Sequence, residues 1–234
     1  MLDSLITLDQ TATLFLNGSN SLFWDGIMQT ATQTKTWIPI LLILLYVIVK
    51  NKYFKNPFSI LIILISVGLC ILLADQGASG ICKPLVQRFR PTNDPFLMYA
   101  IDTVNGYRGG RYGFFSSHAA NTFSVAMFFS FLIKYKPLNF ALFSWALLNC
   151  YTRIYLGVHY VGDILVGILW GCIVGILSYG LCRIFLHKTG DTSQRVFISA
   201  QYTSSNYLIT DIQILILSII ATYFYIVVRA LFFL

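Results

Sequence analysis

Long apolar runs separated by short polar segments make up most of the chain. The runs lie near residues 27–49, 58–78, 118–133, 138–155, 161–185 and 212–234, and the first of them begins with polar residues. A helix of about 20 apolar residues crosses a hydrocarbon core about 30 Å thick. The pattern therefore predicts an all-α fold, a polytopic membrane helical bundle of about six transmembrane helices that forms a single domain over residues 1–234.

Residues 1–17 have a different pattern. Their apolar positions Leu2, Leu5, Ile6, Ala12 and Leu16 fall near one face of a helix, whereas Asp3 and Asp9 fall elsewhere. We expect a short amphipathic helix lying in the membrane interface. The segment lacks a basic region before a hydrophobic core, so no cleavable signal peptide is expected. Trp24 and Trp37 are predicted to anchor the chain at the interface.

Composition agrees with a membrane protein. The chain is 57% hydrophobic and 11% charged, less than half the charged share of a typical soluble domain. Its net charge of +7 comes from basic residues in short loops, which favours membrane topology or an anionic substrate over nucleic acid. The five cysteines include no CxxC pair and are expected to be small buried hydrophobes. With three histidines and no clustered carboxylates, no metal centre is expected.

Six spans would place residues 83–117, residues 153–163 and both termini on one side of the membrane. The turns at 50–57 and 134–137 and the loop 186–211 would lie on the other side. The 16 Lys and Arg residues divide evenly between the sides, but six on the first side belong to the two polar segments predicted to form a site. Without these six, the positive-inside rule places the site outside the cytoplasm.

The first segment that suggests chemistry is KPLVQRFRP, which begins at Lys83. Pro84 suits the first turn of a helix. Lys83 and Arg90 are seven residues apart, or two helical turns, which would place both cations on one face. The alternative is a solvated basic end of a helix.

The second segment is FFSSHAANTF, at the start of the third apolar run. Ser116 or Ser117 can cap this helix, with His118 in its first turn. The free N–H groups and the dipole of a helix N-terminus suit an anion. The alternative is an interfacial cap beside an incidental histidine.

The third segment is RIYLGVHYVGD, residues 153–163, between two apolar runs. Ionisable residues at a membrane are costly and usually functional. If a helix starts near His159, Asp163 lies on the same face and can fix the tautomer of the imidazole. Gly157 lets the chain turn, so that Arg153 can face the same pocket. The alternative is a structural His–Asp pair that ties two spans together.

Together these segments supply cations, a hydroxyl group, backbone N–H donors and two histidines, one of them beside a carboxylate. Fixed cations and N–H donors suit a phosphoryl group, whose charge is spread over its oxygens. One histidine could attack phosphorus while the other protonates the leaving oxygen. The combination predicts phosphoryl chemistry.

The three segments resemble the type 2 phosphatidic acid phosphatase superfamily, which also includes glucose-6-phosphatase and the vanadium haloperoxidases. Its pattern is K-x6-R-P, then P-S-G-H, then S-R-x5-H-x3-D. The matching residues are Lys83, Arg90, Pro91, Ser116, His118, Arg153, His159 and Asp163, all with matching spacing. Phe115, Ser117 and Thr152 stand where the family has Pro, Gly and Ser.

The resemblance implies a role for each matching residue. His159 would be the nucleophile that forms a phosphohistidine, Asp163 would orient it, and His118 would donate a proton to the leaving group. The phosphate would be held by Lys83, Arg90, Ser116, Ser117, Arg153 and nearby backbone N–H groups. No metal and no cofactor would be needed.

The resemblance also implies a phosphatase that acts on a lipid entering sideways from the bilayer. We expect an enzyme of the bacterial cytoplasmic membrane whose substrate is undecaprenyl diphosphate or lipid A, with phosphatidylglycerophosphate or phosphatidic acid next. Arg108 and Arg111, beside Gly109-Gly110, could contact a second anionic group. Alternatively, they form a cationic loop near anionic lipid.

Other functions stay open from the sequence. The same phosphohistidine could pass its phosphate to an alcohol, which would make the protein a phosphotransferase. A lipid-binding or transport protein without turnover is a second alternative. A vanadate-dependent haloperoxidase is disfavoured by the apolar spans, since those family members are soluble. Neither nucleic acid nor an obligate protein partner is expected.

Overall fold

The computed structural model describes residues 2–52, 56–189 and 201–232. Lys55 and Arg195, counted above among the cations opposite the site, lie outside these ranges. The α-helices of the described part are α1 (Leu2–Leu16), α2 (Leu22–Ala31), α3 (Ile38–Lys52), α4 (Phe58–Asp75), α5 (Lys83–Val86), α6 (Ser117–Ile133), α7 (Lys136–Tyr155), α8 (Val161–Lys188) and α9 (Ile209–Leu231). A π-helix, Gln76–Cys82, joins α4 to α5, and short 3-10 turns lie at Thr34–Trp37, Pro91–Asn93 and Val104–Gly106.

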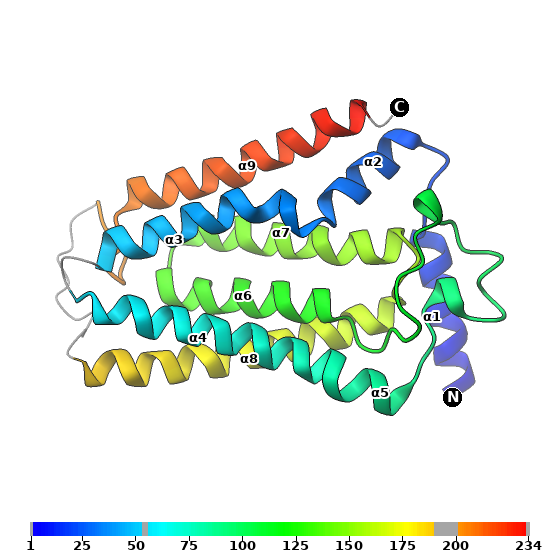
Figure 1. The fold of residues 1–234 in the computed structure, drawn as a ribbon, viewed down its shortest axis with the longest axis horizontal. Coiled ribbons are helices and arrows are strands. Elements are labelled where there is room, and N and C mark those ends of the chain that lie inside the picture. The colour runs from blue at the N-terminus through cyan, green and yellow to red at the C-terminus, as the bar shows by residue number, and fades with distance from the viewer. Residues whose placement is uncertain (1, 53–55, 190–200, 233–234) are drawn as a thin grey trace.

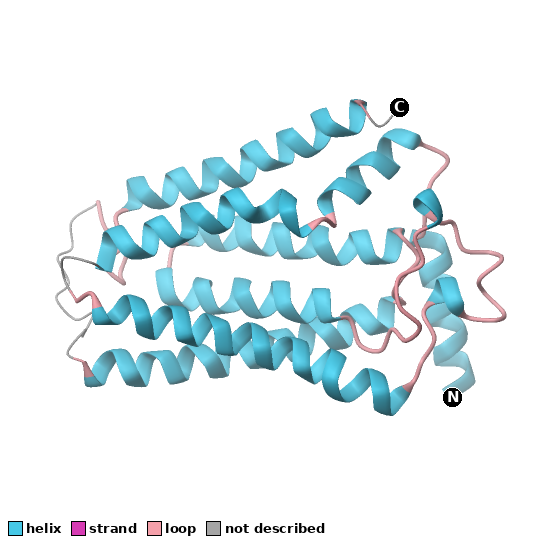
Figure 2. Cartoon of the chain, viewed as in Figure 1, coloured by secondary structure: helices cyan, strands magenta, loops and turns pink. Residues whose placement is uncertain are grey.

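Six long helices, α3, α4, α6, α7, α8 and α9, run along the molecule, and α1 lies across one end of them (Figure 1). Both termini lie at this end, together with the long loop between α5 and α6 and the turn between α7 and α8. The turn between α6 and α7 lies at the opposite end. Figure 2 shows helices and loops but no strand in the described part of the chain. The all-α prediction is confirmed. A helix also forms over Leu2–Leu16, within the segment predicted to be an N-terminal amphipathic helix.

Four segments of the described chain are long and apolar enough to cross a membrane. They are Thr34–Lys52, Phe58–Val86, Val161–Lys188 and Ile209–Leu231. Helix α6 is a shorter apolar helix of 17 residues, and α7 carries polar residues along its length. Both run beside the longer helices in the bundle (Figure 1). The arrangement therefore agrees with the six predicted spans, although α6 and α7 are less apolar or shorter than the rest.

The first span differs from the prediction, because the helix is broken where one continuous run over 27–49 was expected. Helix α2 ends at Ala31 and a 3-10 turn follows before α3 begins. Thr36 Oγ1 donates to the carbonyl of Thr30 at 2.7 Å, and Trp37 Nε1 donates to the carbonyl of Ala31 at 2.8 Å. The Trp37 indole satisfies the Ala31 carbonyl, and the Thr30 carbonyl also accepts from the Gln33 N–H at 3.3 Å. These hydrogen bonds make the break tolerable inside a membrane.

Trp37 is not an interfacial anchor, and that prediction was wrong. Its side chain is buried and makes edge-on contacts with the rings of Trp145 and Tyr223, at centroid distances of 6.0 and 6.1 Å. The donor atom of the indole is occupied by the α2 carbonyl, so the ring belongs to the core. Trp24, by contrast, is 49% exposed in the first turn of α2.

Close packing between α6 and α8 depends on glycines spaced four residues apart in α8. A Cβ atom built at Gly167, Gly171 or Gly175 would lie 2.5–2.6 Å from a backbone oxygen of α6 or of its N-cap residue. The oxygens belong to Ser116, Ala120 and Ser124. Small residues at this spacing let membrane helices approach closely. The stripe fixes the start of α6, with its serines and histidine, against the start of α8, with its aspartate.

Candidate active site

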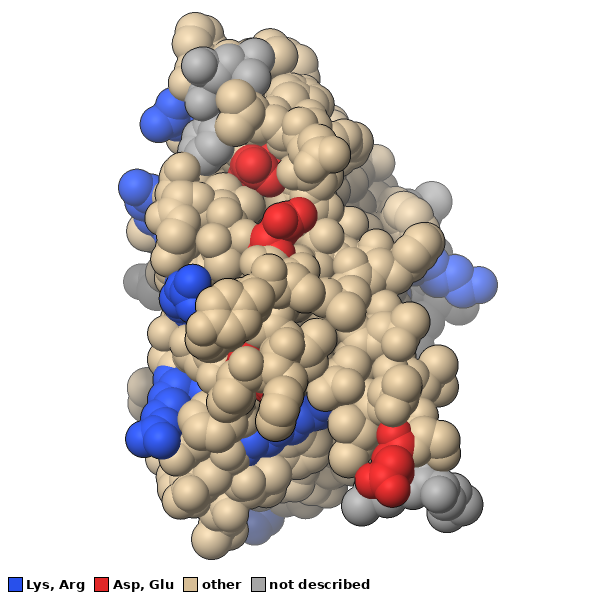
Figure 3. Space-filling model, turned by 90° about the vertical axis from the view of Figure 1, so that its right-hand side faces the viewer, with Lys and Arg blue, Asp and Glu red and all other residues tan. Residues whose placement is uncertain are grey.

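The three segments singled out in the sequence meet at the end of the bundle that holds both termini. Helix α5 carries Lys83, the start of α6 carries His118, and the turn between α7 and α8 carries His159. Figure 3 shows this end of the molecule, where some basic side chains are recessed between uncharged ones. The juxtaposition joins residues that are up to 80 positions apart in the chain.

His159 lies at the centre of the site. Gly157, with φ +67°, reverses the chain after α7, as the sequence predicted. The imidazole is 1% exposed, and its Nδ1 lies 3.4 Å from Oδ2 of Asp163. Its Nε2 lies 3.3 Å from Nη1 of Arg90. Helix α8 begins at Val161, slightly later than expected, yet the His–Asp contact is made.

Arg90 reaches the site by a different route from the one predicted. Helix α5 ends at Val86, and Gln87 has a left-handed φ of 52°, so Lys83 and Arg90 do not share a helical face. The chain then returns along the loop: the backbone N–H of Arg90 donates to the carbonyl of Arg111 at 3.2 Å. The Arg90 guanidinium donates to the carbonyls of Tyr112 and Val158, which aim it at His159.

Lys83 is held in place by two serine hydroxyl groups. Its Nζ donates to Oγ of Ser79 and to Oγ of Ser117, both at 3.1 Å. Ser117 occupies the position where the family pattern has glycine, but it has ordinary helical geometry as the first residue of α6. The position therefore requires no left-handed backbone here, and its hydroxyl holds Lys83 at the helix N-terminus.

The start of α6 is capped as predicted. Ser116 Oγ accepts from the N–H of Ala119 at 3.4 Å, and the Ser116 N–H donates to the carbonyl of Asp163 at 3.1 Å. His118 follows in the first turn and interacts electrostatically with His159 and Arg153. The cap and the second histidine are thus fixed relative to the Asp163 backbone.

Arg153 is 3% exposed and is held by two hydroxyl groups. Its Nη1 donates to Thr32 Oγ1 at 2.6 Å, and its Nη2 donates to the Tyr107 hydroxyl at 3.3 Å. Its buried Nε has no hydrogen-bond partner among the described residues. Buried donors are normally paired, so this N–H is suited to a substrate oxygen.

Burial lowers the pKa of His159 well below its usual value of 6.5, and the nearby charges of Arg90, Arg153 and Lys83 lower it further. A hydrogen bond with the backbone of Gly113 opposes this effect. Burial also lowers the pKa of Arg90, and the positive charge of Arg153 adds to this effect. The imidazole is therefore neutral near pH 7 and keeps the lone pair that a nucleophile requires.

Residues 59–184 match the PAP2 superfamily. The chain belongs to the PAP2 superfamily. It is 38% identical over 180 residues to a lipid A 4'-phosphatase of Bacteroides thetaiotaomicron, covering 76% of this chain and 79% of the relative. It is 35% identical over 186 residues to a lipid A 4'-phosphatase of Porphyromonas gingivalis, covering 80% and 76%.

The fold is similar to the crystal structure of a transmembrane PAP2-type phosphatidylglycerolphosphate phosphatase from Bacillus subtilis. The TM-score is 0.58 at 21% sequence identity, over 77% of this chain and 87% of that one. Together with the relatives, this makes the chain a membrane phosphatase of the PAP2 superfamily.

Two residues of this PAP2 site were missed in the sequence. Arg88 pairs with Asp163, Nη1 to Oδ1 at 3.0 Å, and with Asp9, Nη2 to Oδ2 at 2.7 Å. Arg88 occupies one of the six unspecified positions of the K-x6-R-P pattern, and Asp9 is about 150 positions from Asp163, so no motif or local spacing connects them. The available signal was a carboxylate near the middle of an amphipathic helix, where Asp9 stands among apolar and uncharged polar residues.

The two arginines predicted as headgroup contacts lie on the loop before α6 and are exposed. Arg108 Nη1 donates to the carbonyl of Thr92 at 3.0 Å. The Arg111 guanidinium lies over the rings of Phe89 and Tyr112, 5.3 and 5.4 Å from their centroids. The described contacts of both side chains are thus with the loop that carries Phe89, Thr92 and Tyr112.

Proposed function

We propose that this membrane lipid phosphatase removes a phosphate group from lipid A, at the 4' position, by a phosphohistidine mechanism without a metal. The observation that supports this most directly is the placement of His159. Asp163 lies at one ring nitrogen, Arg90 lies at the other, and Lys83 and Arg153 add positive charge. The names of two relatives, which are lipid A 4'-phosphatases, supply the substrate.

In the first step, Nε2 of His159 attacks phosphorus, a P–N bond forms, and the bond from phosphorus to the sugar oxygen breaks. His118, protonated beside the negative phosphate, gives its proton to that oxygen. Asp163 stabilises the positive charge that develops on His159. Lys83, Arg90, Arg153 and the hydroxyl and N–H groups of Ser116 and Ser117 bind the phosphoryl oxygens, where negative charge must be stabilised.

In the second step, His118 accepts a proton from water while the water oxygen forms a bond to phosphorus. The P–N bond breaks, which releases inorganic phosphate and restores neutral His159. An alcohol in place of water would make the same intermediate a phosphotransferase. The proportion of phosphate released as inorganic phosphate distinguishes the two outcomes.

We also propose that the protein lies in the bacterial cytoplasmic membrane with the site facing the periplasm. Both termini lie at the site end of the bundle, and the positive-inside rule supports a cytoplasmic location for the opposite end. A fusion of a periplasmic reporter enzyme to the C-terminus should be active. An active cytoplasmic reporter at the same position would contradict this orientation.

The test of the function is phosphate release by purified protein in detergent with EDTA present. The panel contains lipid A, undecaprenyl diphosphate, phosphatidylglycerophosphate and phosphatidic acid, with His159→Ala as the control. We expect fastest release from lipid A, unaffected by EDTA and lost in the variant. Release that survives His159→Ala would show that the nucleophile is misassigned, and no release from any lipid by folded protein would favour a binding protein.

A second phosphate on the lipid would be contacted by Arg108 and Arg111. The double variant Arg108→Gln/Arg111→Gln should then lose activity on a lipid with two phosphates, while its activity on a monophosphorylated lipid is kept. An equal loss on both lipids would contradict this contact.

A further inference from the structure

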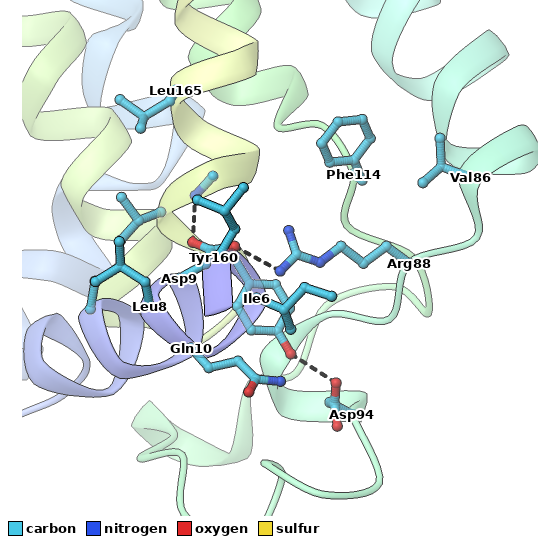
Figure 4. Close-up of a pocket in the computed structure, with 14 residues that line it drawn as sticks. Ile6, Leu8, Asp9, Gln10, Val86, Arg88, Asp94, Phe114, Tyr160 and Leu165 are labelled. Carbon is cyan, nitrogen blue, oxygen red and sulfur yellow. Dashed lines mark hydrogen bonds and ion pairs between the residues drawn. The ribbon is translucent and has the colours of Figure 1, made fainter. Parts of the chain in front are cut away.

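Helix α1 reaches the active site through the side chain of Asp9 (Figure 4). Oδ2 of Asp9 accepts from Nη2 of Arg88 at 2.7 Å, and Oδ1 accepts from the N–H of Gly162 at 2.7 Å. Arg88 uses its other terminal nitrogen, Nη1, to contact Oδ1 of Asp163 at 3.0 Å. One guanidinium therefore connects a carboxylate of the interfacial helix to the carboxylate that faces His159.

The same helix also caps α8, which carries Asp163. The first N–H groups of a helix have no partner within that helix. Here the N–H of Val161 donates to Thr13 Oγ1 at 3.1 Å, and the N–H of Gly162 donates to Asp9. Asp9 and Thr13 are four residues apart and thus lie on one face of α1. Two positions of α1 therefore hold the first turn of α8.

The contact requires close approach. A Cβ atom built at Gly162 would lie 2.9 Å from Oδ2 of Asp9, so a larger residue would displace the carboxylate. A cation–π contact also holds Arg88, since its guanidinium lies over the Tyr160 ring, 3.9 Å from the ring centroid. The Tyr160 hydroxyl in turn donates to Oδ2 of Asp94 at 2.9 Å.

Asp9 and apolar side chains of α1 border an open cavity of about 830 Å³. Apolar side chains that line this cavity include Ile6 and Leu8 of α1, together with Val86 and Leu165 (Figure 4). The polar contacts of Asp9 and Thr13 attach the middle of α1 to α8, while Asn17, just after the helix, donates to the carbonyl of Tyr155 at 2.8 Å.

We propose that Asp9 and Arg88 are positioning residues for the phosphatase reaction, acting through Asp163, and that docking of α1 onto α8 is required for full activity. The inference rests on the proposed roles of His159 and Asp163. With Oδ1 of Asp163 held by Arg88, Oδ2 stays directed at Nδ1 of His159. Oδ2 also accepts from the Tyr160 N–H at 3.1 Å. Without Arg88, Oδ1 loses the guanidinium that holds it, so the carboxylate is less tightly oriented toward His159.

The experiment measures kcat and KM on whichever lipid of the panel the wild-type protein hydrolyses fastest. The variants are Asp9→Asn, Arg88→Gln, Arg88→Lys and the double variant Asp9→Asn/Arg88→Gln. Asp3→Asn is the matched control, because Asp3 is an exposed carboxylate on the same helix. His159→Ala tests the underlying reaction. Assays are run well below each variant's Tm, so that only folded protein is compared.

We expect Asp9→Asn and Arg88→Gln each to lower kcat by about 10–100-fold with little change in KM, as loss of an outer-shell partner typically does. Arg88→Lys should fail to restore kcat, since an ammonium group cannot bridge two carboxylates with a planar fork. The double variant should be no slower than Arg88→Gln alone, because asparagine at position 9 keeps an oxygen for the Gly162 N–H and loses only the ion pair with Arg88.

Several results would overturn the inference while leaving the proposed function intact. The first is a wild-type kcat in Asp9→Asn, and the second is a wild-type kcat in Arg88→Lys. The third is a fold-loss of kcat in the double variant that equals the product of the two single fold-losses. A lower Tm with unchanged kcat would show that the contact is only structural. If wild-type protein releases no phosphate from any lipid, or His159→Ala remains active, the proposed function fails and this inference fails with it.

Discussion

Nη1 of Arg90 lies 3.3 Å from Nε2 of His159, on the side of the imidazole away from Asp163. The nitrogen that would attack phosphorus therefore faces a cation that could bind the phosphoryl oxygens. The backbone carbonyls of Tyr112 and Val158 fix the guanidinium. A phosphate that displaces the Arg90–His159 contact would meet both the nucleophile and a preorganised cation.

Replacing Arg90 with Gln should lower kcat/KM by about 10²–10³-fold, the usual cost of removing one donor to a developing negative charge. The measurement is phosphate release under steady-state conditions, with folding checked by the elution profile in detergent. Arg183→Gln is the control, since Arg183 is an exposed arginine of α8. Similar losses in both variants would indicate a general charge effect rather than a role at the site.

Arg153 offers a test of the unpaired donor in the site. Arg153→Lys retains a positive charge but removes Nε, and it should lower kcat/KM by about 10²-fold if this N–H binds the substrate. Thr32→Val and Tyr107→Phe each remove one hydroxyl that holds the guanidinium, and each should cost less, about 3–10-fold. Full activity in Arg153→Lys would show that only charge is needed at this position.

The depressed pKa of His159 predicts the acid side of the pH profile. Because the folded protein keeps this imidazole neutral below pH 6.5, kcat/KM should not fall as the pH drops through 6.5, and loss should begin only at lower pH. A fall in kcat/KM centred at or above pH 6.5, with no matching change in substrate affinity, would contradict a neutral, buried nucleophile.

The same pKa shift affects stability with a definite sign. The pKa of His159 is lower in the folded state than in the unfolded chain, so below pH 6.5 the unfolded state binds more protons. Stability is therefore lost as the pH falls below 6.5. The Tm of the wild type should decline relative to that of His159→Gln, which cannot titrate there. A constant difference in Tm from about pH 7.5 to pH 5 would refute the shift.

Much of this arrangement was predictable from local sequence. The apolar runs predicted the long helices, and the spacing of Ser116 and His118 predicted a capped helix start that the structure confirms. The predicted resemblance to the superfamily is also confirmed. These features depend on helical periodicity and on short motifs, which a single sequence displays directly.

The features that were not predicted depend on contacts between distant segments. The shared helical face of Lys83 and Arg90 was a reasonable reading of their spacing, but Gln87 ends the helix through a left-handed backbone that its residue type does not signal. The link from Asp9 to Asp163 through Arg88 exists only because α1 folds across the end of the bundle. Neither arises from a periodic pattern.

The glycine stripe of α8 provides the last prediction. In Gly171→Ala, the new Cβ would lie 2.5 Å from the backbone oxygen of Ala120, and a backbone atom inside a packed helix pair cannot move aside easily. We expect a loss of about 1–3 kcal/mol in stability, the usual cost of overpacking, measured as a lower Tm in detergent. Gly180→Ala is the matched control on the same helix, because a Cβ at Gly180 has nothing within 4 Å.

The same substitution should also reduce the activity of the protein that remains folded. Separation of α6 from α8 would lengthen the hydrogen bond from the Ser116 N–H to the carbonyl of Asp163, now 3.1 Å, and would move His118 relative to His159. Gly180→Ala should leave both Tm and kcat near the wild-type values. If the two variants behaved alike, the close approach of α6 and α8 at Gly171 would not be what holds the two halves of the site together.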